Sequence, residues 1–151
     1  MAASEDGPRA LAVLVLLSRF SQLEELAALV GVTPERSWER GSVRGRSAGA
    51  THEYSGVEVR STCSRGESAE AHVDDLLARL EGATDRLRAF AAEAAVRDPA
   101  TIPVRVWVYV ESNSDETAVD LRSDQVLAIG RLGAALGLNV GWLERKARQA
   151  Q

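Results

Sequence analysis

The chain has 151 residues, of which 45% are hydrophobic and 26% are charged, a balance typical of one globular domain rather than a disordered chain. Its formal net charge of −4 argues against a general nucleic-acid binder. The single cysteine, Cys63, excludes an internal disulfide framework and any metal site built from several cysteines, and it fits a reducing compartment.

The N-terminal region shows no targeting pattern. We expect residues 1–8 to form a disordered tail. The nine residues before the first apolar run hold two acids that offset one arginine, so the positive region of a secretory signal is missing. The apolar run Ala10–Leu17 is far shorter than the roughly 20 residues of a membrane span. We therefore predict a buried central strand over residues 10–19 and a cytoplasmic protein.

The next segments predict a short helix and then an irregular region. Apolar residues recur at i, i+3, i+4 and i+7 between Leu23 and Val30, which indicates one helical stripe that ends at Gly31. Glycine, serine and arginine dominate residues 35–52, and this composition predicts a loop with a possible edge hairpin. A short strand is expected at about Tyr54–Thr62, with Val57 and Val59 on one face.

The longest helical pattern runs from Glu67 to about Val96. Its apolar stripe stays in phase across Gly82, although a glycine inside a helix costs about 1 kcal/mol relative to alanine. Because a true break would usually reset the phase, we predict one bent helix rather than two.

The clearest pattern in the chain is Thr101–Glu111, in which side chains alternate strictly. This period of two in β-branched and aromatic residues predicts a strand with one buried face. The buried face is expected to hold Val104, Val106, Val108 and Val110. The other face is expected to hold Arg105, Trp107, Tyr109 and Glu111.

The remaining segments complete a single domain over residues 9–143, followed by a charged tail at 144–151. We expect a short partner strand at Ala118–Leu121, a helix from Ser123 to about Leu136 that Gly137 stops, and a strand at Leu138–Leu143. The fold class predicted from this order is α+β, with a single mainly antiparallel sheet and about three helices packed on one face.

Four segments resemble a known bacterial family, the domain of unknown function 4279. They are L-x-x-x-x-G-V-T-P at Leu26–Pro34, W-E-R-G at Trp38–Gly41, H-V-D-D-L-L-A-R-L at His72–Leu80, and the glycine-rich stretch Leu121–Val140. The resemblance covers roughly residues 10–143. It implies a shared fold and, by the family's own name, no activity.

Catalysis by cysteine and histidine has few candidates. Cys63, His52 and His72 are the residues available, and Arg60 or Arg65 could lower the pKa of the thiol. Nucleophilic catalysis also requires a histidine within hydrogen-bond reach and a third group that orients it, which nothing in the spacing demands. The simpler interpretation is a buried or half-exposed thiol, so we assign no catalytic residue.

Metal and cofactor sites are not indicated either. His72, Asp74 and Asp75 do not share one helix face, and the acidic residues between Glu111 and Asp124 lack the alternation and glycine of a calcium loop. No phosphate-binding glycine loop, dinucleotide fingerprint, nucleophile elbow or zinc-type histidine pair is present. We expect no metal and no cofactor.

Two features suggest a binding surface. The loop with Arg36, Arg40, Arg44, Arg46 and Trp38 combines cations with an aromatic ring, so it could bind phosphate, RNA or an acidic protein surface, or be a flexible exposed loop. The second feature is the face of the Thr101–Glu111 strand opposite the valines. Its aromatic rings either lie under a helix or form an exposed platform for an interface. The predicted partner-binding residues are Arg105, Trp107, Tyr109, Trp38 and Arg40.

The leading hypothesis is a non-enzymatic module, accessory or immunity-type, that binds a protein partner or a second copy of itself as a homodimer. The alternative is a small-molecule sensor or enzyme with a pocket between the sheet and the long helix, near Cys63 or a histidine. Whether the protein is an enzyme stays open, with the balance of motifs against it.

Overall fold

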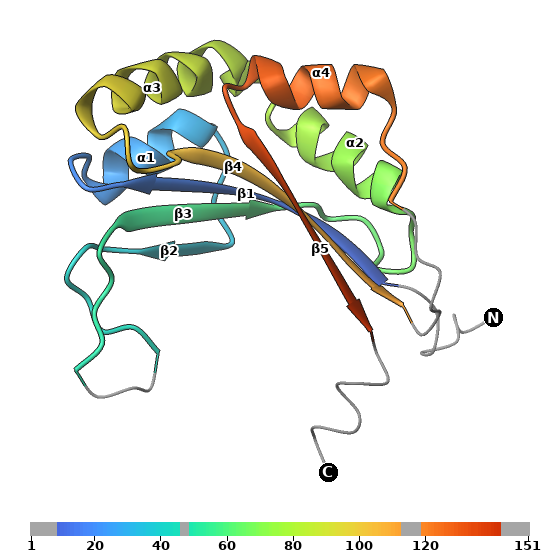
Figure 1. Ribbon diagram of the computed structural model, residues 1–151, viewed down its shortest axis with the longest axis horizontal. Coiled ribbons are helices and arrows are strands. Elements are labelled where there is room, and N and C mark those ends of the chain that lie inside the picture. The colour runs from blue at the N-terminus through green and yellow to red at the C-terminus, as the bar shows by residue number, and fades with distance from the viewer. Residues whose placement is uncertain (1–8, 46–48, 113–118, 143–151) are drawn as a thin grey trace.

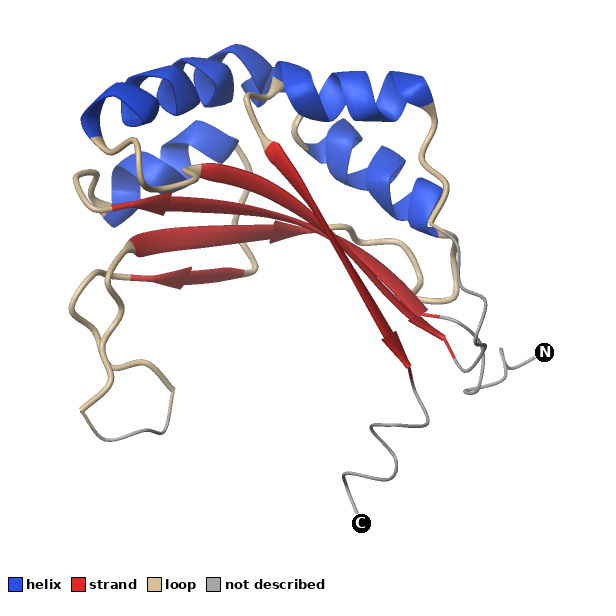
Figure 2. Ribbon diagram, viewed as in Figure 1, coloured by secondary structure: helices blue, strands red, loops and turns tan. Residues whose placement is uncertain are grey.

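The computed structural model describes residues 9–45, 49–112 and 119–142, and the predicted tails at 1–8 and 144–151 lie outside this range. The elements, in chain order, are β1 (Arg9–Ser18), α1 (Leu23–Val30), β2 (Arg36–Trp38), β3 (Ser55–Arg60), α2 (Ala69–Arg79), a 3₁₀ turn η1 (Glu81–Ala83), α3 (Thr84–Arg97), β4 (Val104–Ser112), α4 (Ser123–Arg131) and β5 (Ala135–Trp142). In the described part of the chain, all helices lie on one side of one twisted sheet (Figures 1 and 2).

The sheet has five strands in the order β2-β3-β1-β4-β5. β1 is central and pairs antiparallel with both β3 and β4, whereas β5 runs parallel to β4. The α+β class is therefore confirmed, but the sheet is mixed. The parallel pair arises because α4 carries the chain back across the helix layer between β4 and β5, as parallel strands require.

The core lies between the sheet and the helices. β1 contributes Ala12, Leu14 and Leu16, each with no measurable exposure, and β4 contributes the predicted valines. These side chains alternate along their strands, so one face of the sheet is apolar throughout. The helices cover it with Leu26 and Val30 from α1, Val73 and Leu76 from α2, Leu87 from α3 and Ile129 from α4.

The prediction of a single helix over Glu67–Val96 is wrong. This segment forms two helices, α2 and α3, so the described residues contain four α-helices rather than about three. α2 and α3 are separated by η1, where the Leu80 amide donates to both the Leu76 and Leu77 carbonyls. Leu80, Ala83 and Leu87 are all buried across this junction. The 3₁₀ turn changes the helix direction while keeping these side chains on the core, so the apolar phase survives a real break.

The C-terminal boundaries also differ from the prediction. α4 ends at Arg131, not Leu136, because Gly133 takes a left-handed conformation with φ of 72°. β5 therefore begins at Ala135 rather than Leu138. Residues 119–121 of the predicted strand Ala118–Leu121 are not in a strand, and residue 118 lies outside the described residues.

Gln125 joins α4 to α2. Its side chain is 1% exposed, and Nε2 donates to the Glu70 carbonyl and to Oδ1 of Asp74, both at 2.9 Å. Its Oε1 accepts from the Arg122 amide at 3.0 Å. These hydrogen bonds hold α4 against α2, in the part of the helix layer from which the chain continues into β5.

We predict that Gln125→Ala lowers the free energy of unfolding by about 2–3 kcal/mol, because it removes the three hydrogen bonds of the buried Gln125 side chain and leaves a cavity in its place. The neighbouring Val126, which is 47% exposed, provides the control: Val126→Ala should change stability by less than about 0.5 kcal/mol. Urea denaturation followed by circular dichroism measures both. Equal losses in the two variants would contradict the role given to Gln125.

Candidate functional site: the open face of the sheet

The register of the strands determines which side chains share the face opposite the helices. Val13 of β1 lies opposite Arg60 of β3 and opposite Trp107 of β4. Trp107 in turn lies opposite Gly137 of β5. Since paired residues project from the same side, these four positions form one row across the sheet. The full set on this open face is Arg36 and Trp38 from β2, Gly56, Glu58 and Arg60 from β3, the odd-numbered residues 9–17 from β1, the odd-numbered residues 105–111 from β4, and the odd-numbered residues 135–141 from β5.

Arg105, Trp107 and Tyr109 therefore lie where no described helix covers them (Figure 1). Each is half-buried by its neighbours on the sheet. The guanidinium carbon of Arg105 lies 5.0 Å from the centre of the Trp107 ring, and the rings of Trp107 and Tyr109 are 6.1 Å apart. These contacts form a continuous strip of one cation and two rings along β4.

The Trp107 ring lies flat over Gly137. A Cβ atom added at Gly137 would come within 2.4 Å of Trp107 Cε3, which is closer than atoms tolerate. Trp38 repeats this arrangement on the other side of the sheet, because a Cβ at its cross-strand partner Gly56 would lie 2.3 Å from Trp38 Cζ2. Each indole thus replaces the missing side chain of a glycine, which fixes the ring against the sheet.

Trp38 belongs to the same face as Trp107 but not to the same cluster. Two strands separate β2 from β4, a distance of roughly 14 Å at ordinary strand spacing. Trp38 stacks on His52 at 5.5 Å, and Arg36 lies over its ring at 5.4 Å. The second predicted loop residue, Arg40, donates from Nη1 to the Arg19 carbonyl at 2.9 Å, so it anchors the β2–β3 connection to the turn after β1.

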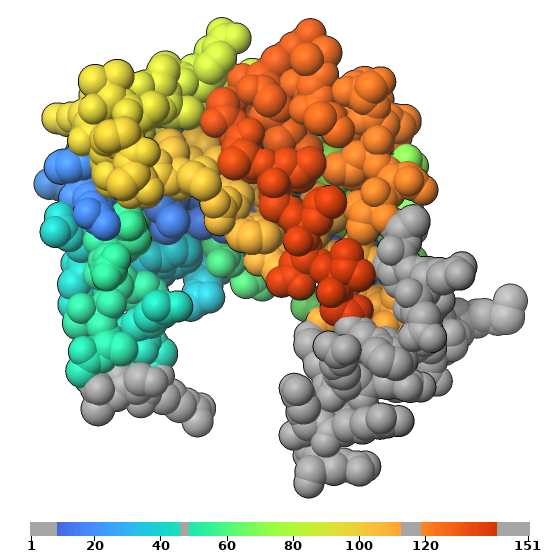
Figure 3. Space-filling model, in the orientation of Figure 1, coloured from blue at the N-terminus to red at the C-terminus, as the bar shows by residue number. Residues whose placement is uncertain are grey.

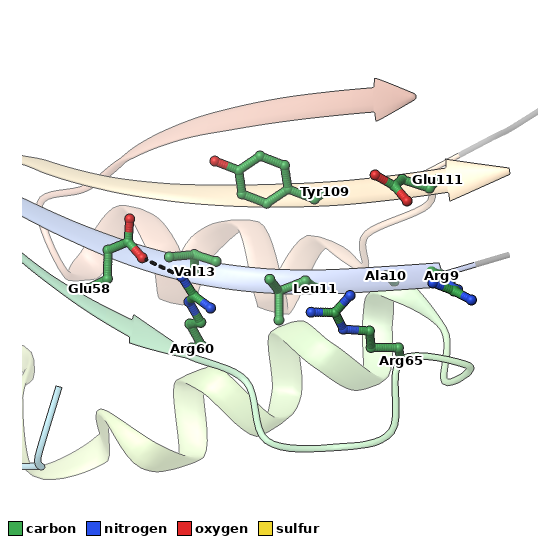
Figure 4. A pocket seen from close by; sticks show the side chains of 9 residues that line it. All are labelled: Arg9, Ala10, Leu11, Val13, Glu58, Arg60, Arg65, Tyr109 and Glu111. Atoms are coloured by element: carbon green, nitrogen blue, oxygen red, sulfur yellow. Dashed lines mark hydrogen bonds and ion pairs between the residues drawn. The ribbon is translucent and has the colours of Figure 1, made fainter. Parts of the chain in front are cut away.

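Three shallow hollows open on this face. One of about 250 Å³ has Leu11 and Val13 as its floor, with Arg60 and Arg65 on one side and Tyr109 on the other (Figure 4). A second, of about 240 Å³, lies beside Arg105 and Trp107. The third, of about 390 Å³, lies beside Trp38. Two of the three are smaller than the roughly 300–1,000 Å³ of small-molecule pockets and the third is near the lower end of that range, so they suit individual side chains of a partner.

The charges on the open face are mostly positive. Its strand residues include four arginines, Arg9, Arg36, Arg60 and Arg105, and two glutamates, Glu58 and Glu111. Glu58 accepts from Arg60 at 3.0 Å, while the Nε–H of Arg60 is buried without an acceptor among the described residues. Arg65 adds a further guanidinium at the hollow in Figure 4. A local positive surface on a chain of net charge −4 favours an acidic partner.

Tyr109 keeps its proton on this face. Burial first, and then the Glu58 carboxylate, raise the pKa of the phenol, while Arg60 acts in the opposite direction. The protonated hydroxyl can therefore donate a hydrogen bond to an acidic group placed beside the arginines.

The sequence pattern identified part of this face. The alternation of Thr101–Glu111 placed Arg105, Trp107 and Tyr109 on one side, and the Tyr54–Thr62 pattern placed Glu58 and Arg60 away from Val57 and Val59. Leu11 and Val13 were missed as floor residues, because a strand that is apolar on both faces gives no signal for which face is open. Arg65 comes from a loop and has no periodic signal.

Cys63 and His72, which the sequence did not bring together, are in contact. Cys63 Sγ lies 3.2 Å from Nδ1 of His72, and Ser61 Oγ lies 2.7 Å from the same nitrogen. His72 Nε2 lies 2.9 Å from the Ser64 carbonyl and so carries the proton, which leaves Nδ1 as an acceptor. Ser61 Oγ accepts from the Ala12 amide at 3.0 Å, so this buried network ties the loop after β3 to β1 and α2.

The electrostatics of the pair do not favour a thiolate. Burial first, and then the negative charges of Asp75 and Glu67, raise the pKa of the Cys63 thiol. A reactive cysteine needs the opposite, a positive environment that lowers the pKa. The network therefore has the properties of a structural anchor.

The side chains of His72, Asp74 and Asp75 make hydrogen bonds to three different sets of partners and do not converge on one point. Asp74 binds Arg122 and Gln125, and hydrogen bonds from these side chains lower its pKa. Asp75 accepts from the Thr62 amide. In the described residues, no three histidine, cysteine, aspartate or glutamate side chains are arranged to hold a metal ion.

A further hollow, of about 360 Å³, lies on the helix side between α1 and α3. It is lined by Phe20, Leu29 and Phe90 together with charged residues such as Glu25 and Arg86. Neither Cys63 nor a histidine lines this hollow. It therefore lacks the cysteine or histidine that the small-molecule hypothesis placed in a pocket near the long helix.

The fold places the chain in the class of α+β domains with a half-covered mixed sheet. A family model matches residues 9–141, nearly the whole described chain, and the chain belongs to that family, DUF4279, a domain of unknown function. No curated protein and no solved structure matches the chain. Within the described residues, none of the helices has the length and apolar character needed to cross a bilayer.

We predict that Gly137→Ala displaces the Trp107 ring and lowers the free energy of unfolding by about 1–3 kcal/mol, as overpacking does. Gly141→Ala on the same strand is the matched control, because its Cβ would meet Glu111 Cγ at an ordinary 3.6 Å. Chemical denaturation of both variants measures the difference. An unchanged stability for Gly137→Ala would show that Trp107 does not need this glycine.

We predict that Cys63 is alkylated by iodoacetamide at neutral pH more slowly than the same cysteine in the urea-unfolded chain. A raised pKa leaves a smaller fraction of thiolate at neutral pH. The alkylation rate should therefore rise with pH, and the pH of its half-maximal value should lie above the roughly 8.5 of a free thiol. Alkylation rates between pH 6 and 10 give this midpoint. A folded-state rate above that of the unfolded chain at pH 7 would instead indicate a thiolate activated by His72, as an enzyme would require.

Proposed function

We propose that this protein is a non-enzymatic binding module that docks an acidic protein surface on the open face of its sheet. The observation that supports this most directly is the strip of Arg105, Trp107 and Tyr109 on a face that no described helix covers. Half-buried aromatic rings and arginines are the residue types that dominate the binding energy of protein interfaces.

The chemistry of the partner follows from the charges on that face. An excess of arginines over glutamates attracts a negative surface and disfavours a positive one. The apolar column of β1, Leu11, Val13, Val15 and Leu17, lies between Arg60 of β3 and the strip of β4, and provides an apolar centre. Such an apolar centre with a charged rim is the usual arrangement of a protein interface.

The shape of the face supports a protein rather than a small molecule. Its three hollows are shallow and adjoin one another, since two of them share Leu17 and Tyr54, and each is lined by residues of at least two strands or their connections. A row of shallow hollows offers a single compact ligand little enclosure, whereas a protein surface can place one side chain in each. The two indoles, fixed over Gly137 and Gly56, are ordered before binding, which reduces the entropy lost on association.

Variants on the two sides of the sheet test the proposal. The protein is used to capture partners from an extract of its native host, and captured proteins are purified and titrated against each variant by calorimetry. Trp107→Ala should weaken binding by roughly 30-fold or more, as loss of a central aromatic residue does. Arg105→Glu should weaken it further by repulsion. Arg88→Glu on α3, an exposed arginine on the helix side, is the charge-matched control and should bind as the wild type does.

Two results would overturn the proposal. One is a purified partner whose binding depends on Arg88 and is unchanged by Trp107→Ala in a folded protein. The other is tight, salt-dependent binding of single-stranded RNA by the open face, since aromatic rings with arginines also stack on bases.

A further inference from the structure

The sheet ends in two very different edges. β2, at one edge, has three residues, begins with Arg36 and pairs over just three positions. β5, at the other edge, has eight residues that pair with β4 over their whole length, and no strand of the described residues pairs with its outer side. The outer amides and carbonyls of β5 therefore form a long template for another strand.

β5 lacks the features that usually protect an edge strand. From residue 132 to residue 143 the chain reads L-G-A-A-L-G-L-N-V-G-W-L, with no charged residue and no proline. Natural edge strands are normally short or carry lysine, proline or a bulge that prevents pairing with another chain. A long, neutral and regular edge is the opposite of this pattern, so we expect β5 to pair with a strand of another chain.

Several apolar side chains of β5 are also exposed. Leu136, Leu138 and Val140 lie opposite the buried Val106, Val108 and Val110, so they project toward the helix side of the sheet. They are 38%, 53% and 53% exposed, because β5 lies at the border of the helix layer. α4 contacts β5 on this side and exposes Val126 and Leu127, and the two elements form one surface in the space-filling view (Figure 3).

We propose that β5 is a homodimer interface, in which the β5 strands of two copies pair antiparallel about a two-fold axis perpendicular to the sheet. Such an axis keeps the helices of both copies on the same side, so the apolar row of one sheet continues into the other. The exposed Leu136, Leu138 and Val140 of each copy then contact those of its partner.

The chemistry of the edge favours a second copy as the occupant. An uncharged apolar strand is matched by another uncharged apolar strand, since a charged segment would lose hydration without gaining a counter-ion. Every copy of this chain presents such a strand with equal length. The charged three-residue β2 cannot substitute, which disfavours head-to-tail pairing of β5 with β2 and leaves a closed dimer rather than a fibre.

Mass photometry and light scattering over a dilution series test the interface. The wild type should form a species of about 32 kDa, twice the 16.2 kDa of the chain. Leu138→Lys places a charge at the centre of the edge and should weaken dimerisation by at least about a hundredfold, because two lysines meet at a two-fold axis. Val96→Lys, at an 84% exposed position on α3, is the matched control and should leave the dimer intact.

Two additional experiments distinguish pairing through β5 from association through the open face or through the helix side. Trp38→Ala, on the open face of β2 at the opposite edge of the sheet from β5, should leave the mass unchanged, whereas association through the open face would be weakened by it. In a Cys63→Ser background, Leu138→Cys should form a disulfide between copies, because position 138 lies at the two-fold axis, whereas Val96→Cys should not. This readout does not depend on the folding of Leu138→Lys.

A wild type that stays monomeric at high concentration would overturn the proposal. A Leu138→Lys protein that remains dimeric while folded, as judged by circular dichroism, would do the same. Species larger than a dimer would contradict the two-fold symmetry.

Discussion

The antiparallel pairing of β1 with β4 is the constraint on which the rest of the structure depends. Eight residue pairs join the two strands, from Arg9 opposite Glu111 to Leu16 opposite Val104. This register places Ala12, Leu14 and Leu16 beside the buried valines of β4, and it places Val13 and Val15 beside Trp107 and Arg105. A slip by one residue would move the aromatic strip into the core and the valines into solvent. The core and the open face are thus two results of one register.

The open face is a consequence of how the chain distributes its helices. All four α-helices of the described residues pack on the valine side, where α2 contacts the central strand β1 and α1 contacts β3. The other side is left to its own side chains, and Trp107 and Trp38 cover it by lying over glycines of neighbouring strands. The same indoles that shield the sheet are the ones that we propose contact a partner. They are half-buried because each packs over a glycine of the neighbouring strand.

Sequence patterns predicted two of the strands well but misjudged where helices end. The alternation of Thr101–Glu111 appears in the structure as β4, and the pattern around Val57 and Val59 appears as β3. The helix break at Leu80–Ala83 was not predicted, since a 3₁₀ turn shifts the helix axis without disturbing the apolar phase. The end of α4 was misplaced by five residues because Gly133, rather than Gly137, takes the left-handed conformation that stops the helix. Glycines at both positions look alike in a sequence.

The sequence by itself determined the α+β class, the buried valine face and the membership of Arg105, Trp107 and Tyr109 in one opposite row, because a strand's period of two follows from local backbone geometry. Tertiary structure alone decided which row faces the helices on β1, since both of its faces are apolar. It also decided that β5 runs parallel at an open edge, and that Cys63 meets His72 from a different element. These features depend on contacts between segments far apart in the chain, and no local pattern encodes where such segments meet.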